Sequence, residues 1–286
     1  MTVFSLHKSL TALLDENNIE DSSLEARFIL QHILGLSYSN YILHSTYEVS
    51  QEHVNLAENM INRRINGEPL QYIIGEWDFM GMTLRVGKGV LIPRPETEIL
   101  CEYVLENIKN IASPVVYDLC SGSGCIGLSI KNERPDAKVF LVEKSDEALV
   151  YLKENCKNIC GDNLPEIIQG DILRYDSFEN LPFADVIISN PPYIRSDEIP
   201  SLQKEVLFEP EMALDGGEDG LIFYRVLVNE WSQKLKNTGF MAFECGEDQS
   251  DDIKSLFKAI AFDSETINDY NNIQRIVTGR RKTDVI

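Results

Sequence analysis

Four consecutive residues, Asn190-Pro191-Pro192-Tyr193, combine groups that suit chemistry on a planar amine. They follow the apolar run 184–188, so they are expected where a buried strand ends in a loop, a common place for a site in an α/β sheet. Each proline fixes its own φ near −65° and restricts the residue before it. The Asn190 amide and the Pro191 carbonyl would then be held in fixed directions beside an aromatic ring, ready to receive an NH2 group. The alternative is a Pro-Pro loop with a capping asparagine and a packed tyrosine.

A second candidate site is the glycine-rich stretch Asp118-Leu119-Cys120-Ser121-Gly122-Ser123-Gly124, which follows an earlier apolar run. Its glycines allow a sharp turn and the close approach of a ligand to a helix N-terminus. Glu143 lies 21 residues beyond Gly122, at the end of the next predicted strand, where a carboxylate can accept both hydroxyls of a ribose. On this motif alone, a nicotinamide dehydrogenase is a rival interpretation.

Two observations favour S-adenosylmethionine over a dinucleotide. Asp118 stands directly before the glycine turn, where a carboxylate would repel a pyrophosphate but attract a cationic amino acid, and no histidine for hydride chemistry follows His53. S-adenosylmethionine has a ribose for Glu143, two positive groups for the acidic side, and no phosphate. Asp171 and Ile172, after the third predicted strand, are expected to meet the adenine at its amino group and its ring face. The alternative for Asp171 taken alone is a helix N-cap.

The elements that must position these residues fall into three regions. Residues 1–75 predict short helices, with Ser22-x-x-Glu25 resembling a capping box and Gly35 as a helix stop. Residues 76–92 predict a hairpin-like linker. Residues 93–286 predict a catalytic domain in which strands alternate with helices.

Alternation of apolar runs with helical stretches predicts an α/β fold with a doubly wound, mostly parallel sheet. A last strand is expected to close the sheet, running either parallel or antiparallel to its neighbour. The predicted strands are 114–119, 138–142, 166–169, 184–188, 239–243 and 273–278. A helix is predicted after the proline-stiffened stretch 92–98, running to about 109, and further helices are predicted over 125–132, 146–158 and 220–235.

The composition restricts the partners and the compartment. With 26 basic and 46 acidic residues the formal charge is −20, which opposes binding to a phosphate backbone and suits a basic protein partner or simply solubility. No apolar run is long enough to span a membrane. Six cysteines show no paired framework, so reduced thiols in a cytoplasmic protein are expected, and the larger domain has no histidine with which to bind a metal.

Taken together, the Asp-x-Cys-x-Gly-x-Gly loop and Asn-Pro-Pro-Tyr resemble the class I S-adenosylmethionine-dependent methyltransferases that act on planar nitrogens. Three further stretches resemble the release factor glutamine methyltransferase family (PrmC, also called HemK). They are Pro-Leu-Gln-Tyr-Ile-Ile-Gly at 69–75, Ile-Pro-Arg-Pro-Glu-Thr-Glu at 92–98, and Ala-Leu-Asp-Gly-Gly-Glu-Asp-Gly-Leu at 213–221. The resemblance covers nearly the whole chain. It implies a seven-stranded sheet, preceded by a helical domain that contacts the release factor.

The resemblance also implies a reaction. The methyl group of S-adenosylmethionine passes to the side-chain nitrogen of the glutamine in the Gly-Gly-Gln motif of peptide chain release factors, leaving S-adenosylhomocysteine. Asn190 and Pro191 would each accept one amide N–H, Tyr193 would stack on the amide, and Pro192 would complete the substrate site. The cofactor would be held by Asp118, Cys120, Ser121, Gly122, Ser123, Gly124, Glu143, Asp171, Ile172 and Asn190.

This sequence departs from the family pattern at two positions. Cys120 stands where the family usually has glycine, and Glu143 stands where it usually has aspartate. These two departures affect the expected geometry of the ribose site. Two alternatives remain: a nucleic-acid amino-methyltransferase, which the charge opposes, and a non-catalytic binding module. The roles of Glu209 and Glu244 stay open.

Overall fold

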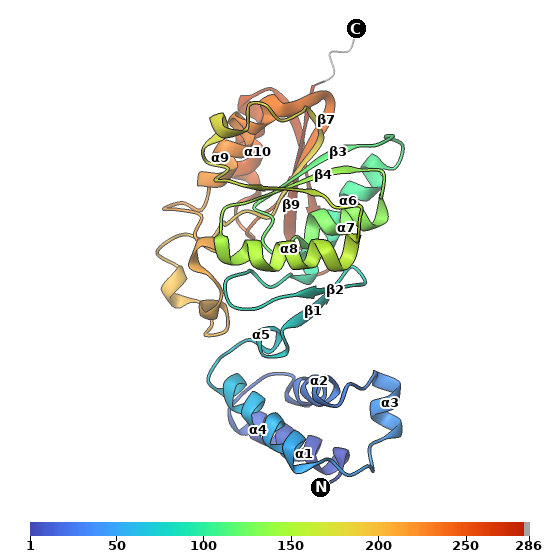
Figure 1. Ribbon diagram of the computed structural model, residues 1–286. Coiled ribbons are helices and arrows are strands. Elements are labelled where there is room, and N and C mark those ends of the chain that lie inside the picture. The colour runs from blue at the N-terminus through green and yellow to red at the C-terminus, as the bar shows by residue number, and fades with distance from the viewer. Residues whose placement is uncertain (283–286) are drawn as a thin grey trace. The chain divides into compact units, whose positions relative to one another are not determined.

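The computed structural model describes residues 1–282, and its chain forms two compact units (Figure 1). The first unit comprises Met1–Glu76 together with Gln203–Phe208. The second comprises Trp77–Leu202 and the residues from Glu209 onward. A short segment from far along the sequence therefore belongs to the N-terminal unit.

The first unit is helical, as the sequence predicts. Its helices pack through apolar side chains at helical spacing, such as Leu6, Leu10 and Leu14, which are fully buried. Gly35 ends the second helix in the left-handed conformation (φ 61°), which confirms the predicted stop. The helices are α1 (Val3–Glu16), α2 (Ser22–Leu34), α3 (Tyr38–Leu43), α4 (Gln51–Ile65) and α5 (Leu70–Ile74).

The predicted capping box at the start of α2 is wrong. Asp21 occupies the N-cap position with a left-handed φ of 52°, and its side chain makes no capping hydrogen bond. The Ser22 hydroxyl instead donates to Asp15 Oδ1 (2.5 Å), and Glu25 accepts from Arg64 (2.7 Å). Both side chains that match the pattern are thus engaged by other helices, and this tertiary pairing replaces the local cap.

The second unit is built on a seven-stranded sheet of order β5-β4-β3-β6-β7-β9-β8. The first five strands in this order are parallel, and β9 runs antiparallel to both β7 and β8. The antiparallel direction considered for the last strand is confirmed. The strands are β3 (Val115–Leu119), β4 (Lys138–Glu143), β5 (Glu166–Gln169), β6 (Ala184–Ser189), β7 (Leu235–Glu244), β8 (Phe262–Asn268) and β9 (Gln274–Arg281).

The edge strand β8 was not among the strands predicted from apolar runs. Its sequence, Phe-Asp-Ser-Glu-Thr-Ile-Asn, is mostly polar and only partly buried. Such a strand is held by its ladder with β9 rather than by a hydrophobic run, so the apolar pattern does not reveal it.

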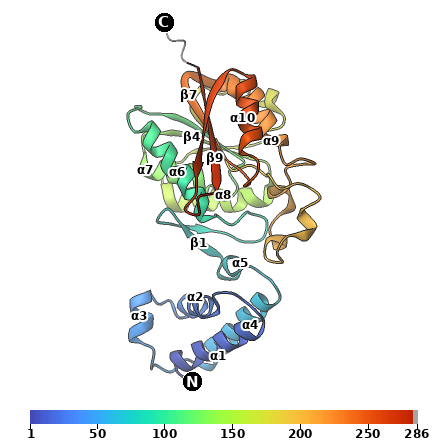
Figure 2. The ribbon, with the colours of Figure 1, turned by 180° about the vertical axis from the view of Figure 1, so that it is seen from behind.

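Helices cover both faces of this sheet, and successive strand residues serve the two faces in turn. Val116 packs in the core beneath one group of helices, whereas Tyr117 packs in the core beneath the other. Figure 2 shows α6 and α7 on one side of the sheet and α9 and α10 on the other. The helices are α6 (Pro95–Ile108), α7 (Cys125–Glu133), α8 (Asp146–Cys160), α9 (Ile222–Asn229) and α10 (Ser250–Ala259).

A two-stranded sheet precedes α6. Strands β1 (Glu76–Phe79) and β2 (Met82–Arg85) are joined through Met80 and Gly81, both at positive φ. The loop after β2 contributes to the site described below. Among the described residues, no helix is both long enough and apolar enough to cross a membrane.

Candidate active site

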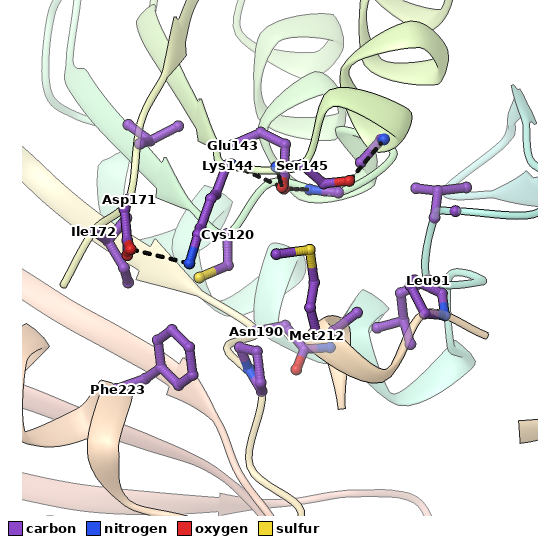
Figure 3. Close-up of a pocket in the computed structure, with 18 of the residues that line it drawn as sticks. Leu91, Cys120, Glu143, Lys144, Ser145, Asp171, Ile172, Asn190, Met212 and Phe223 are labelled. Carbon is purple, nitrogen blue, oxygen red and sulfur yellow. Dashed lines mark hydrogen bonds and ion pairs between the residues drawn. The ribbon is translucent and has the colours of Figure 1, made fainter. Parts of the chain in front are cut away.

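A cavity of about 270 Å³ lies at the carboxyl ends of β3, β4, β5 and β6. The strand order reverses between β3 and β6, and the crevice at such a reversal is the usual ligand site of doubly wound sheets. Two loops, 89–91 and 210–215, supply further walls. Figure 3 shows side chains from these separate segments converging on one space.

The glycine loop after β3 forms one wall through Cys120 and Gly122. Both residues have left-handed backbones (φ 64° and 54°), which explains why glycine is favoured at position 120. A Cβ built on Gly122 would meet only Val90, at 3.9 Å, so the backbone here is open to a ligand. Burial raises the pKa of the Cys120 thiol well above its ordinary value, so this side chain is a neutral part of the wall.

Asp118 does not line the cavity, although the sequence placed it in the cofactor site. It is fully buried, and its Oδ2 accepts from the backbone N–H of Gly127 (2.8 Å), which braces the start of α7. Its Oδ1 is buried and has no hydrogen-bond partner among the described residues. Burial raises the pKa of Asp118 to about 7, outweighing the hydrogen bond from Gly127. This carboxyl group therefore retains an unused acceptor behind the glycine loop.

Three other predicted cofactor residues also lie behind the wall. Ser121 and Ser123 are buried. The hydroxyl of Ser121 donates to the Asp118 carbonyl (2.8 Å), and the Ser123 carbonyl accepts from Asn155 (2.9 Å). Gly124 has a left-handed backbone (φ 83°), which favours glycine, and a Cβ there would also meet the side-chain ends of Leu152 (2.5 Å) and Leu128 (2.9 Å). These residues shape the loop, and none of them lines the cavity.

Glu143 lines the cavity at the end of β4, as the spacing predicts. Its carboxylate already accepts three backbone hydrogen bonds, from Gly122 to Oε2 (2.8 Å) and from Lys144 (2.8 Å) and Ser145 (2.7 Å) to Oε1. A carboxylate has about four acceptor positions, so Oε2 keeps one for a hydroxyl group. The longer glutamate side chain thus serves both the loop and the cavity.

Asp171 and Ile172 line the cavity after β5, also as predicted. Asp171 Oδ2 forms an ion pair with Lys144 (3.0 Å), and its Oδ1 accepts from the backbone of Leu173 (3.0 Å). Burial would raise the pKa of Asp171, but the hydrogen bonds from Lys144 and Leu173 prevail and lower it. Figure 3 shows this ion pair spanning two strand ends beside the cavity. Asp171 does not cap a helix; it shapes a turn.

Asn190 and Pro192 line the cavity, whereas Pro191 and Tyr193 do not. The Asn190 side chain donates through Nδ2 to the hydroxyl of Thr97 (3.3 Å). The carbonyl of Tyr193 accepts from Gln249 (2.8 Å), which fixes the end of the tetrapeptide. The Asn-Pro-Pro-Tyr segment is therefore held at both ends.

Several cavity residues were missed by the sequence reasoning. Leu91, Met212 and Phe223 supply apolar surface, and Figure 3 shows Leu91 and Met212 near Asn190. Buried Glu209 joins the two loops that carry Leu91 and Met212, because it accepts from the backbone of Ile92 (2.9 Å).

The signal for these residues was present in the sequence. Arg94, in the Ile-Pro-Arg-Pro-Glu-Thr-Glu stretch, pairs with Glu209 and so helps to join the same two loops. That stretch and the Ala-Leu-Asp-Gly-Gly stretch resemble family motifs, but the resemblance alone does not reveal their contacts. Within residues 1–282, no three His, Cys, Asp or Glu side chains are grouped in a way that could hold a metal ion.

Comparison with known proteins finds two family matches along the chain. Residues 5–75 match the PrmC N-terminal domain, and residues 96–228 match the methyltransferase small domain. A release factor glutamine methyltransferase of Thermodesulfovibrio yellowstonii is 39% identical over 259 residues, which are 88% of this chain and 90% of that protein. The protein of the same name from Clostridium acetobutylicum is 37% identical over 94% of this chain and 95% of its own length.

Solved structures support the fold. The hMettl16 catalytic domain, in complex with a 3'UTR hairpin, superposes with a TM-score of 0.57 at 13% identity, covering 83% of this chain and 84% of that chain. The T. thermophilus 16S rRNA methyltransferase RsmC, in complex with AdoMet and guanosine, gives a TM-score of 0.51 at 16% identity, covering 72% of this chain and 50% of that chain. At such identities the likeness concerns the fold alone.

Proposed function

Because this chain belongs to the release factor glutamine methyltransferase family, we propose that it methylates the side-chain nitrogen of the Gly-Gly-Gln glutamine of peptide chain release factors. S-adenosylmethionine is the methyl donor, and S-adenosylhomocysteine is the product. The observation that carries this function is the identity of 39% to a relative of that name over nearly the whole chain. The placement of Asn190 in a cavity at the strand ends supports it.

The residues around the cavity fit S-adenosylmethionine. Gly122 leaves its backbone open, Oε2 of Glu143 keeps an acceptor position for a ribose hydroxyl, and Ile172 offers an apolar face to the adenine. Asp171 provides a carboxylate at the adenine end. Above its pKa of about 7, the buried Asp118 carboxylate adds negative potential behind the glycine loop, which favours the cationic amino-acid part. When bound, this cofactor supplies an electrophilic methyl group on a positively charged sulfur.

In this proposal the substrate amide is held by Asn190, which lines the cavity, and by the backbone carbonyl of Pro191, which follows Asn190 in the chain but does not itself line the cavity. A carboxamide nitrogen is a weak nucleophile because its lone pair is delocalised into the carbonyl group. Asn190 Oδ1 and the Pro191 carbonyl each accept one of its N–H groups, which orients the nitrogen toward the cofactor side of the cavity. Orientation and preorganised hydrogen bonding of this kind lower a barrier by several kcal/mol. The methylated nitrogen loses a proton readily, so no strong base is needed.

The helical unit and the acidic surface are proposed to receive the release factor. Residues 5–75 match a domain characteristic of this family, and the net charge of −20 complements a basic partner. In this proposal residues 1–75 form the recognition domain, residues 76–92 form a linker, and residues 93–286 form the methyltransferase domain. The same charge opposes direct binding of nucleic acid, and the protein is proposed to act in the cytoplasm.

Mass spectrometry of the reaction products tests this function. A release factor is incubated with the enzyme and S-adenosylmethionine, beside a release factor whose Gly-Gly-Gln glutamine is replaced by alanine. The expected result is a gain of one methyl group on that glutamine and no gain in the variant. Methylation of oligonucleotides without methylation of the release factor would instead support a nucleic-acid amino-methyltransferase.

A further inference from the structure

The amide of Asn190 has two ends of nearly equal shape and opposite hydrogen-bonding character. Rotation by half a turn about the last side-chain bond exchanges the acceptor Oδ1 with the donor Nδ2. The proposed function, on which this inference rests, needs Oδ1 to face the substrate. A planar amide cannot select this orientation by itself, so its neighbours must do so.

The neighbours of Asn190 form a directed hydrogen-bond chain. The hydroxyl of Thr97 donates to Oε2 of Glu244 (2.6 Å), and Asn190 Nδ2 donates to the oxygen of that hydroxyl (3.3 Å). A threonine hydroxyl has a single proton. Once this proton is committed to a carboxylate, the oxygen can only accept, so Asn190 must present its NH2 group to Thr97. Its oxygen is then directed away from Thr97.

These three residues meet because of the sheet topology. In the β6–β7 ladder, Ile188 pairs with Ala242, and both belong to the core beneath α6. Asn190 follows Ile188 by two residues, and Glu244 follows Ala242 by two residues. Because side chains alternate between the two faces of a strand, Asn190 and Glu244 lie on this same side of the sheet. Thr97 lies in the first turn of α6, which packs over these strand ends. Thr97 and Glu244 are almost completely buried, at 1% and 2% exposure.

We propose that Thr97 and Glu244 are positioning residues, which act through Asn190 by fixing which end of its amide faces the substrate. Neither is a catalytic residue, because neither lines the cavity. The buried pair is satisfied only in this arrangement, since a carboxylate cannot donate and the hydroxyl cannot donate twice.

The state of Glu244 matters for this chain. Burial raises the pKa of Glu244 to about 7, although the Thr97 hydrogen bond lowers it. At pH 8 the carboxylate is therefore mainly ionised and can accept from Thr97. The other groups whose charges act on Glu244 are Arg275 and Arg94, which favour the ionised form, and Glu96, which opposes it. The nearby phenols of Tyr193 and Tyr224 are held neutral by burial, which raises the pKa of each.

The test compares Thr97→Val with Thr97→Ser at pH 8, by steady-state methylation of a release factor. Valine keeps the volume but removes the hydroxyl, so kcat should fall about tenfold or more, while KM and cofactor affinity stay within about threefold. Serine should restore most of kcat. Thr278→Val, an equally buried threonine on β9, is the matched control and should leave kcat unchanged.

A double-mutant cycle separates positioning from simple packing. In an Asn190→Ala background, Thr97→Val should reduce kcat by no more than about twofold, because its effect passes through the missing amide. An equal reduction in both backgrounds, or full kcat in Thr97→Val, would overturn the proposal. Calorimetric cofactor binding by each variant shows that it is folded.

A spectroscopic measurement tests the chain without turnover. The side-chain NH2 resonances of Asn190, assigned by comparison with Asn190→Ala, should shift in Thr97→Val and remain in place in Thr97→Ser. Unchanged resonances in Thr97→Val would also overturn the proposal. If the wild-type enzyme fails to methylate the release factor, the proposed function fails, while this measurement still decides whether Thr97 orients Asn190.

Discussion

The carboxylate of Glu143 accepts a hydrogen bond of 2.8 Å from the backbone N–H of Gly122, which joins the end of β4 to the glycine loop after β3. The same side chain also binds the backbone of Lys144 and Ser145. One carboxylate therefore holds two walls of the cavity in register, and its remaining acceptor position faces the proposed ribose site. The glutamate at this position supports the loop, and it is proposed to bind the ligand as well.

Replacing Glu143 by alanine should weaken S-adenosylmethionine binding by about tenfold or more, because both the ribose acceptor and the loop support are lost. Isothermal titration calorimetry measures this affinity. Glu154→Ala is the matched control, since this glutamate lies on α8 with an exposed side chain and should leave binding unchanged. Equal affinities for the wild type and Glu143→Ala would contradict the proposed ribose contact.

Replacing Asn190 by alanine should reduce methyl transfer by about two orders of magnitude or more, because one of the two acceptors for the substrate amide is removed. Cofactor binding should change little. Quantitative mass spectrometry and calorimetry on the same preparation measure the two quantities. Asn163→Ala, an exposed asparagine outside the cavity, is the control. Normal turnover in Asn190→Ala would refute the two-acceptor account.

Replacing Arg64 by alanine should destabilise the helical unit by about 3 kcal/mol. Arg64 is buried and binds both Glu25 (2.7 Å) and Glu205 (2.9 Å), so its loss leaves the half-buried Glu25 carboxylate without its partner. Urea unfolding followed by circular dichroism measures the change. The adjacent Arg63 is 41% exposed and pairs with Glu68, so Arg63→Ala should cost less than about 1 kcal/mol. Similar losses of unfolding free energy in both variants would show that the buried ion pair stabilises the protein no more than the exposed one.

The unfolding free energy should depend on pH through Asp118. Its pKa is about 7 in the folded protein and returns to its ordinary value near 4 on unfolding, so the folded state binds the proton more tightly. Stability from this residue is complete below about pH 4 and is lost as the pH rises toward 7. In Asp118→Asn the unfolding free energy should therefore fall less between pH 5 and pH 8, by a few kcal/mol at most. Unfolding curves at the two pH values measure this difference.

The matched control for this pH dependence is Asp136. The hydrogen bond from Arg134 lowers the pKa of Asp136 to about 2, so this residue contributes stability that is lost as the pH falls, the opposite sign. Asp136→Asn should therefore leave the decline between pH 5 and pH 8 as it is in the wild type. A decline that persists in full in Asp118→Asn would assign it to other groups, such as Glu244.

Binding of the release factor should weaken as salt is added. The net charge of −20 attracts a basic partner surface, and added ions screen this attraction. Raising sodium chloride from about 50 mM to about 300 mM should increase the dissociation constant several-fold, with most of the change in the association rate. Surface plasmon resonance measures both. An affinity that does not depend on salt would rule out charge as the main attraction.

The sequence by itself determined the local features of this protein. The glycine turn, the carboxylate 21 residues after it and the stiff Asn-Pro-Pro-Tyr segment are each encoded within a short stretch of chain. Their backbone conformations follow from the residues themselves, and apolar periodicity predicts most of the strands and helices. The polar edge strand β8 escaped this reasoning because its ladder with β9 supplies what its side chains do not.

Only the tertiary structure decided how these features cooperate. Asp118 was expected beside the ligand, yet strand order and burial turn it into a brace for α7. Thr97 lies 93 residues before Asn190 and 147 residues before Glu244 in the sequence. The three residues meet because β6 and β7 are neighbours beneath the first turn of α6. Spacing along the chain cannot reveal such contacts, since they depend on which strands are adjacent and which faces are covered.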